Sequence, residues 1–478
     1  MTEPKTAKSD LLRALPSVNA LLRTETARAL SLRMGAQHLT RLARSVTAEL
    51  RASVQTQAAK PTASNGGLTR AALLEEAARR LEDACLREAS VGLRHVINAS
   101  GVILHTNLGR APLSEAARRA VAMEAARYCT LEYDLETGER GRRGARAEKL
   151  LVDLTGAESA LVVNNCAAAA LLILTALAQG GETIISRGEL VEIGGDFRVP
   201  DVMAQSGTSL TEVGTTNRTR LADYRQAITD NTRLVMRVHP SNYRIVGFTA
   251  SPELAELARL AHERGLPLYE DAGSGALADL SPFGLAGEPV ISESIKAGAD
   301  LISFSGDKLL GASQAGLIVG RLELVERLRR HPLYRALRAD KLSLAALEAT
   351  LEAHRRAVST TEIPALRMLA LTHDEILKRA RAFILKLKKH SRPPSFRSEI
   401  IEGESAIGGG SAPTTHPPTA LIALTHETLS ADALDKALRL SQPPVIARIS
   451  EGRVVLDLRT VADDEEQDLL AVLTALAA

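Results

Sequence analysis

The sequence predicts an α/β protein with a mainly parallel sheet, and residues 157–320 provide the main reason. Short apolar strands alternate there with helical patterns, as expected for a parallel sheet that helices cover on both faces. The expected strands after the first lie at 183–186, 210–213, 233–238, 266–270, 301–305 and 317–320. Ligands of such sheets collect at the carboxyl ends of the strands, so these ends are where site residues are expected.

The chain of 478 residues is too long for one compact core, so several domains are expected. Helical leucine spacing predicts a small helical domain over residues 1–60, and residues 61–95 read as a linker and an amphipathic helix. A large α/β domain over 96–340 and a helical connection with a small α/β domain over 341–478 complete the prediction. The glycine-rich loop at 403–418 is long enough to serve a site or an interface.

Lys308 is the first candidate site residue, because it lies in a turn between two predicted strands. A lysine held against an apolar sheet loses hydration, so its amine deprotonates more easily and can condense with an aldehyde. Pyridoxal phosphate is held by a lysine in this way. This stretch alone leaves open the alternative that Lys308 is an ordinary surface lysine.

Asp271 strengthens the interpretation of Lys308 as a cofactor lysine. It ends an apolar strand, and the small residues after it let a flat ligand approach the backbone. In pyridoxal enzymes with the fold of aspartate aminotransferase, an aspartate holds the pyridinium nitrogen protonated and the lysine follows some tens of residues later. Asp271 and Lys308 have this order and this separation.

A possible phosphate site lies at 164–166, where an apolar strand runs through Asn164, Asn165 and Cys166 into a helix of small residues. The first amides of a helix have no partner within the helix and can cradle an anion. Asn165, Asp271 and Lys308 in this order predict a pyridoxal-phosphate site more specifically than any of them alone.

The positive charge of the chain is concentrated at its amino-terminal end. The whole chain has a formal net charge of +2, but residues 1–60 hold ten Lys and Arg against four Asp and Glu. A basic helical domain suits a polyanionic partner, with binding that weakens as salt rises. An oligomerisation module with a solvated charged face is the alternative.

The cysteines and the amino terminus indicate a cytoplasmic protein. Cys85, Cys129 and Cys166 stand far apart, so neither a disulfide framework nor a metal site is expected. The amino terminus is polar and charged, without the apolar core of a signal peptide, and no membrane span is predicted.

Two groups of arginines are candidates for binding an anion. Arg140, Arg142 and Arg143 lie among glycines and could present their guanidinium groups to a ligand, or the segment is a plain surface loop. Arg335 and Arg338 are about one helical turn apart and could form a two-pronged clamp. Salt bridges to nearby acids are the alternative for this second pair.

Six motifs closely resemble those of bacterial selenocysteine synthases, the L-seryl-tRNA(Sec) selenium transferases. The resemblance covers nearly the whole chain, and it departs from the family pattern at Cys166, where a further Asn is usual. The matching stretches are 96–113, 131–138, 186–195, 238–243, 271–275 and 305–308.

The resemblance implies a pyridoxal-phosphate enzyme of fold type I, the aspartate aminotransferase-like fold. It also implies a homodecamer built as a ring of dimers, with the basic amino-terminal domain gripping the tRNA. The implied reaction converts L-seryl-tRNA(Sec) to L-selenocysteinyl-tRNA(Sec) through an aminoacrylyl-tRNA intermediate, with selenophosphate as the selenium donor.

The resemblance also implies roles for individual residues. Lys308 carries the cofactor and acts as general base, Asp271 holds the pyridinium nitrogen, and Asp307 orients Lys308 or a proton in transfer. Asn164, Asn165, Cys166 and Ser305 complete the expected cofactor site. The selenophosphate role falls to Arg110, Arg335 and Arg338, contributed across a subunit boundary.

Two other functions remain open at this point. A related small-molecule pyridoxal lyase, acting on an amino acid or amino sugar acid, would use Lys308 and Asp271 but not the basic amino-terminal domain. A non-catalytic tRNA-binding scaffold would use that domain but has no need of the lysine and the aspartate.

Overall fold

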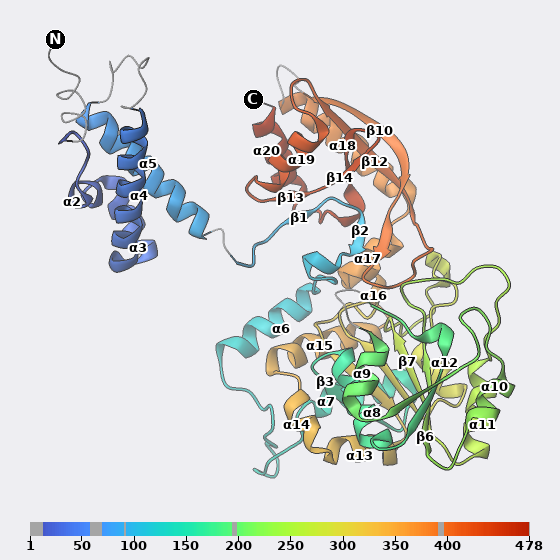
Figure 1. Ribbon diagram of the computed structural model, residues 1–478. Helices are drawn as coiled ribbons and strands as arrows, with labels where there is room; N and C mark the ends of the chain where they lie inside the picture. The colour runs from blue at the N-terminus through green and yellow to red at the C-terminus, as the bar shows by residue number, and fades with distance from the viewer. Residues whose placement is uncertain (1–12, 58–68, 90–91, 194–197, 391–395, 478) are drawn as a thin grey trace. The chain divides into compact units, whose positions relative to one another are not determined.

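The computed structural model describes residues 13–57, 69–89, 92–193, 198–390 and 396–477 (Figure 1). The chain forms two compact units, Met1–His95 and Val96–Ala478. Residues 61–68, at the start of the expected linker, lie outside the described residues. The division of the chain into the four expected segments stays a prediction.

The amino-terminal unit is helical in all of its described elements. Ser17 and Thr24 begin the first two helices by accepting hydrogen bonds from amides three residues on, as capping residues do. Leucines from all four helices, among them Leu21, Leu39 and Leu81, are fully or almost fully buried in one core. The helices are α2 (Val18–Leu22), α3 (Glu25–Met34), α4 (Ala36–Gln57) and α5 (Arg70–Ala89).

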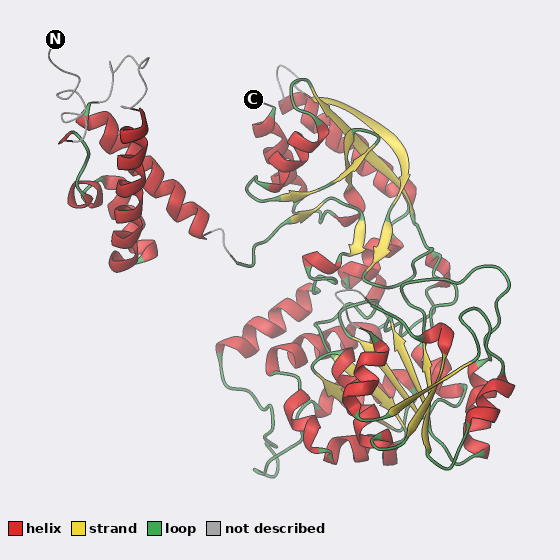
Figure 2. Cartoon of the chain, viewed as in Figure 1, coloured by secondary structure: helices red, strands yellow, loops and turns green. Residues whose placement is uncertain are grey.

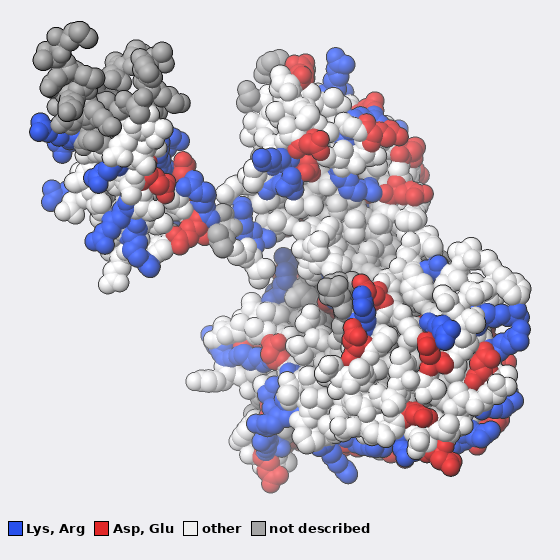
Figure 3. Space-filling model, viewed as in Figure 1, with Lys and Arg blue, Asp and Glu red and all other residues white. Residues whose placement is uncertain are grey.

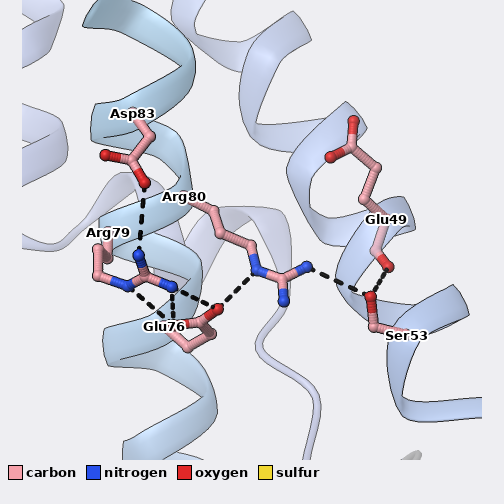
Figure 4. A network of polar contacts seen from close by, with 6 residues as sticks. All are labelled: Glu49, Ser53, Glu76, Arg79, Arg80 and Asp83. Atoms are coloured by element: carbon pink, nitrogen blue, oxygen red, sulfur yellow. Dashed lines mark hydrogen bonds and ion pairs between the residues drawn. The ribbon is translucent and has the colours of Figure 1, made fainter. Parts of the chain in front are cut away.

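A polar network on α5 reaches the neighbouring helix α4 (Figure 4). Glu76 accepts from both Arg79 and Arg80, and Arg80 also donates to the Ser53 hydroxyl at 3.4 Å. Arg79 lies a further 3.5 Å from Asp83. These two arginines are therefore neutralised by acids of their own helix, whereas Arg44 and Arg51 on α4 are exposed.

A seven-stranded sheet forms the centre of the second unit (Figure 2). Its strand order is β3-β9-β8-β7-β6-β4-β5, and every pair is parallel except the two made by β9. The prediction of a mainly parallel sheet is confirmed. The strands are β3 (Ser159–Val163), β4 (Glu182–Ser186), β5 (Ser209–Val213), β6 (Thr232–Val238), β7 (Leu268–Gly273), β8 (Leu301–Ser305) and β9 (Gly316–Gly320).

Helices cover both faces of this sheet because successive strand residues point to opposite sides. Leu161 and Leu301 pack with α8, α9 and α13, while Val162 and Ile302 pack with α7, α12 and α15. The helices of this region are α6 (Glu115–Ala126), α7 (Ala145–Thr155), α8 (Cys166–Ala178), α9 (Val199–Ser206), α10 (Leu221–Ala227), α11 (Leu254–Glu263), α12 (Ile291–Lys296), α13 (Leu322–Arg330), α14 (Pro332–Leu337) and α15 (Lys341–Arg355). The short 3-10 helices are η1 (Thr106–Leu108), η2 (Arg187–Glu189) and η3 (Ser281–Phe283).

A second, antiparallel sheet forms the carboxyl-terminal part, with the order β10-β12-β15-β14. Two short parallel pairs, β1 with β13 and β2 with β11, tie residues near 100 to this part of the chain. The strands are β1 (Ile97–Asn98), β2 (Val102–Leu104), β10 (Phe396–Glu404), β11 (Ala406–Gly408), β12 (Pro418–His426), β13 (Val445–Ile446), β14 (Arg448–Ser450) and β15 (Arg453–Asp457). The helices are α16 (Ser359–Glu362), α17 (Pro364–Ala370), α18 (His373–His390), α19 (Ala431–Arg439), η4 (Leu458–Thr460) and α20 (Glu466–Leu476).

Arg459 joins the segments around the second sheet. It is 1% exposed and donates to the main-chain oxygens of Met368, Leu371 and Pro418 and to the Ser405 hydroxyl. A buried guanidinium is tolerated only where such partners replace its hydration. Among the helices that the structure describes, none is long and apolar enough to cross a membrane.

We expect Arg459→Met to lower the free energy of unfolding by roughly 3–5 kcal/mol, because several buried acceptors lose their donor at once. Urea denaturation followed by circular dichroism measures the change. Arg439→Met is the matched control, since Arg439 makes an exposed pair with Asp435 at 2.9 Å on one face of α19. An equally small loss for both variants would contradict the joining role of Arg459.

Candidate active site

Lys308 lies in the turn between β8 and β9, at the carboxyl end of β8, and is only 5% exposed. The turn is fixed by main-chain hydrogen bonds, including Gly306 N to Ala315 O at 2.9 Å and Leu309 N to Ser274 O at 3.0 Å. Burial lowers the pKa of the Lys308 amine, and the positive charge of Arg110 lowers it further. The expectation of a desolvated, rigidly held lysine agrees with this geometry.

Asp271 lies near the end of β7 and is 8% exposed. Strand β7 pairs with β8, the strand that leads to Lys308. Its Oδ1 accepts from the Ser303 hydroxyl at 3.1 Å and from the Cys166 thiol at 3.5 Å. Burial raises the pKa of the Asp271 carboxyl, while Ser303 and Lys308 act in the opposite direction. Asp271 is thus a buried acid whose ionisation depends on its immediate neighbours.

Helix α8 begins at the same edge of the sheet as these two residues. Asn165 caps it by accepting from Ala168 N at 2.8 Å, and Cys166 follows as the first helical residue. The Cys166 side chain points to Asp271 and Ser303. Asn164 is exposed, and its main-chain N donates to Leu337 O. Asn164 is not among the residues that line the cavity described next.

A cavity of about 570 Å³ brings most of the predicted site residues together. Its walls come from the ends of several sheet strands, from the start of α8 and from the segment 106–110. The predicted residues that line it are Arg110, Asn165, Cys166, Asp271, Ser305 and Lys308. Other lining residues include Thr106, Asn107, His239, Ser241, Gly273 and Gln314.

Asp307 links Lys308's turn to Arg110. Its Oδ2 accepts from Arg110 Nη1 at 2.8 Å, and its Oδ1 accepts from the Ser305 hydroxyl at 2.7 Å. Arg110 itself has φ of 62°, a left-handed backbone that is unusual for a residue with a side chain. The ion pair therefore fixes a cation at the cavity wall.

The glycine-rich loop of the carboxyl-terminal part reaches this site. Gly408, Gly409 and Gly410 all have positive φ, which residues with a side chain rarely adopt. A Cβ placed on Gly410 would lie 3.9 Å from Lys308 Nζ and 3.6 Å from Asn242 Cβ. The long loop predicted to serve a site or an interface thus contributes to the surroundings of Lys308.

His239 lines the cavity and Glu288 is buried behind it, and sequence reasoning assigned neither of them a role. His239 Nε2 lies 3.5 Å from Glu288 Oε2, and Glu288 Oε1 accepts from Ala412 N at 3.2 Å. Two signals pointed to His239, namely its position directly after a predicted strand and its place in the matching stretch 238–243. Glu288 lies in an irregular segment and gave no signal.

Several buried polar atoms around the cavity make no hydrogen bond within the described residues. These atoms are Arg110 Nε, His239 Nε2 and Asn242 Oδ1. Buried polar groups normally have partners, so a cluster without them favours a polar ligand at this place.

The other candidate arginines lie outside the cavity lining. Arg338 and Arg143 both pair with Glu132, at 2.9 and 2.7 Å, and Arg335 is exposed on α14. Arg140 also pairs with Glu132, and Arg142 pairs with Glu148. Within one chain, Arg335 and Arg338 therefore form no clamp at this cavity, and salt bridging describes Arg338 and the three loop arginines.

A buried lysine and a buried aspartate at the carboxyl edge of a mainly parallel sheet are typical of the pyridoxal-phosphate enzymes of fold type I. The solved structure of a D-glucosaminate-6-phosphate ammonia-lyase has a similar fold, with a TM-score of 0.57 and 20% identity. The match covers 82% of this chain and 98% of that one. At this identity, the likeness concerns the fold alone.

The chain belongs to the L-seryl-tRNA selenium transferase family, whose model matches residues 96–462. An L-seryl-tRNA(Sec) selenium transferase of Geobacter metallireducens is 50% identical over 420 residues, which are 87% of this chain and 91% of that relative. The one of Moorella thermoacetica is 47% identical over 467 residues, 97% of this chain and 96% of that relative. The resemblance found in the sequence motifs is confirmed.

We expect Gly316→Ala to destabilise the site, because a Cβ at Gly316 would lie 2.0 Å from the main-chain oxygen of Asn165. Strand β9 and the start of α8 would have to move apart, at a cost of roughly 1–3 kcal/mol. The midpoint of thermal unfolding measures this loss. Gly141→Ala is the control, since its Cβ would meet Asp134 N at an ordinary 3.5 Å. Equal midpoints for the two variants would contradict the close approach.

Proposed function

We propose that this chain is a transferase that converts L-seryl-tRNA(Sec) to L-selenocysteinyl-tRNA(Sec), using pyridoxal phosphate and selenophosphate. The proposal rests on membership of the L-seryl-tRNA selenium transferase family together with the buried Lys308 and Asp271 in one cavity. The related small-molecule lyase that the sequence left open has no use for the basic amino-terminal unit. Family membership favours the transferase over that alternative.

Pyridoxal phosphate fits the residues around the cavity. Lys308 offers a desolvated amine, and Asp271 offers a carboxylate on the neighbouring strand. The amides of Cys166 and Ala167 precede the first main-chain bond of α8, which Ala169 N makes to Asn165 O, so they suit the phosphate. Ser305 and the Asn165 side chain border the same space, whereas Asn164 contributes at most through its backbone.

The protein residues supply binding, orientation and proton transfer. Bound pyridoxal phosphate supplies an aldehyde for the amine and an electron sink for the carbanion that precedes loss of the β-hydroxyl group. Lys308, with its lowered pKa, can accept the α-proton of the seryl group as a general base. Asp307 holds Arg110 and shares the Ser305 hydroxyl, so it positions the turn that carries Lys308.

Selenophosphate requires cationic hosts, and Arg110 is the candidate that lines the cavity of a single chain. We assign Arg335 and Arg338 to the same anion in the assembled enzyme, contributed from a second subunit. Neither arginine lines this chain's own cavity, so this assignment requires a site that two copies share. A homodecamer built from dimers is the assembly that we propose on the family resemblance, with the cytoplasm as its location.

The amino-terminal unit is our candidate for gripping the tRNA. On the face drawn in Figure 3, Lys and Arg side chains are spread over this unit, and Asp and Glu occupy smaller areas. The exposed Arg44 and Arg51 of α4 are suited to contact phosphates, since within the described residues no ion pair holds them as Glu76 holds Arg79. The predicted domain 1–60 together with α5 would form this module.

The conversion assay supplies purified protein with selenophosphate and serine esterified to tRNA(Sec), and the released amino acid is identified. We expect selenocysteine from the wild type and none from Lys308→Ala, which also loses the Schiff-base absorbance because the lysine that lines the cavity is gone. Binding of the tRNA should stay within about twofold. Lys296→Ala, which removes an exposed lysine on α12, is the control and should convert normally.

Absence of conversion by a wild-type protein that still forms the Schiff base would overturn the transferase and favour a lyase. Loss of tRNA binding in Lys308→Ala would contradict the separation of catalysis from tRNA grip.

We expect the double substitution of Arg44 and Arg51 by Ala to weaken tRNA binding about tenfold at moderate salt. The slope of log affinity against log salt should fall by about 1 for each phosphate contact that is lost. Filter binding over a series of salt concentrations measures both quantities. Arg79→Ala is the matched control, because Glu76 and Asp83 already offset the Arg79 charge. Unchanged affinity and slope in the double variant would remove α4 from the tRNA interface.

A further inference from the structure

A chain of buried hydroxyl groups leads through the central sheet to Asp271. Tyr269 Oη lies 2.8 Å from Ser303 Oγ, and Ser303 Oγ lies 3.1 Å from Asp271 Oδ1. Tyr269 and Ser303 are both 0% exposed. These contacts are therefore shielded from water. In such an interior, hydrogen bonds are strong and a missing partner is costly.

The strand register explains why these three side chains meet. Tyr269 and Asp271 are two residues apart on β7, so they point to the same face of the sheet. Asp271 pairs with Ser303 of β8 in the parallel register, which places Ser303 beside both. This is the face on which α8 packs, and Cys166 at the start of that helix completes the group.

The chain has one favourable direction. Burial raises the pKa of Tyr269 well above its ordinary value, so the phenol keeps its proton and can donate to Ser303. Ser303 has one proton, and it donates this proton to Asp271. Burial likewise raises the pKa of the Cys166 thiol, which makes it a second donor to the same carboxylate oxygen.

These donors act on a carboxylate that burial would otherwise neutralise. The titratable groups that act on the pKa of Asp271 are Lys308 and Cys166, and Asp271 in turn raises the pKa values of its strand neighbours Tyr269 and Glu270. Among the protein groups that favour the ionised form of Asp271, the Ser303 hydrogen bond has the largest effect on its pKa, ahead of the Lys308 charge. A protonated Asp271 cannot hold a protonated pyridine nitrogen, so the donors matter for the site.

We propose that Ser303 and, acting through it, Tyr269 are positioning residues that keep Asp271 ionised and oriented toward the cofactor nitrogen. The proposal rests on the pyridoxal-phosphate function proposed above. A merely structural role would require only the ring of Tyr269, since a phenylalanine would fill the same space without a hydroxyl to satisfy.

The test compares Ser303→Ala, Tyr269→Phe and the double variant, each purified with pyridoxal phosphate. The absorbance of the Schiff base is followed against pH, and the dissociation constant of the cofactor is measured. A less ionised Asp271 leaves the pyridine nitrogen less protonated, and this nitrogen then withdraws less charge from the Schiff base. We expect the midpoint of the spectral titration to move upward by about 1 pH unit in Ser303→Ala. Cofactor affinity should fall roughly tenfold.

Tyr269→Phe should shift both quantities in the same direction but less. The double variant should match Ser303→Ala alone, because Tyr269 acts through Ser303 and the two effects are not additive. Ser303→Thr, which keeps a hydroxyl, should restore the wild-type midpoint. Thr183→Val is the control. Thr183 lies on β4, and its hydroxyl is 2.8 Å from the Thr208 hydroxyl in a buried pair. Loss of this pair should leave the spectrum unchanged.

The outcomes separate this proposal from the function on which it rests. Suppose that the wild type converts seryl-tRNA(Sec) while Ser303→Ala has an unshifted midpoint and normal cofactor affinity. This result would overturn only the relay, that is, the hydrogen-bond chain from Tyr269 through Ser303 to Asp271. Additive shifts in the double variant would overturn the order Tyr269 to Ser303 to Asp271. A wild type without a Schiff base would overturn both proposals. If Ser303→Ala does not fold, the nearly isosteric Tyr269→Phe decides, and a wild-type midpoint in that variant overturns the relay.

Discussion

The removal of Lys308 and Asp271 from water is the constraint on which the site depends. Burial moves their pKa values toward the neutral forms, downward for the amine and upward for the acid. A neutral amine serves the chemistry, whereas a neutral acid does not. The surroundings differ accordingly. Arg110 stands near the lysine and further lowers its pKa, while hydroxyl and thiol donors converge on the aspartate.

The topology of the sheet places these two different environments on neighbouring strands. Asp271 and Ser303 lie on adjacent parallel strands in register, and Lys308 follows in the turn to the antiparallel strand β9. Because β9 also pairs with β3, the same turn is held close to the start of α8. The tight approach of Gly316 to Asn165 is the point where lysine turn and helix start constrain each other.

The sequence predicted those parts of the site that depend on local patterns. Lys308 and Asp271 were found because each follows an apolar strand, and the strand alternation predicted the parallel sheet. Glu288 and the approach of Gly410 to Lys308 could not be predicted in this way, because they bring together segments more than a hundred residues apart. Helical spacing suggested the arginine clamp and the resemblance assigned it an anion, but neither carries information about Glu132, which pairs with Arg338.

Glu132 is an acid that holds a cluster of arginines together within the chain. It accepts from Arg140, Arg143 and Arg338, so these three guanidinium groups share one carboxylate and the group keeps a net positive charge. Arg110 is also paired, but with Asp307, which belongs to the turn that carries Lys308. Asp307 accepts from Arg110 Nη1, and Nε has no hydrogen-bond partner among the described residues, so an anion that binds Nε would share the guanidinium with Asp307. Of the arginines considered, Arg110 is thus the one through which an anion in this cavity is electrostatically linked to the lysine.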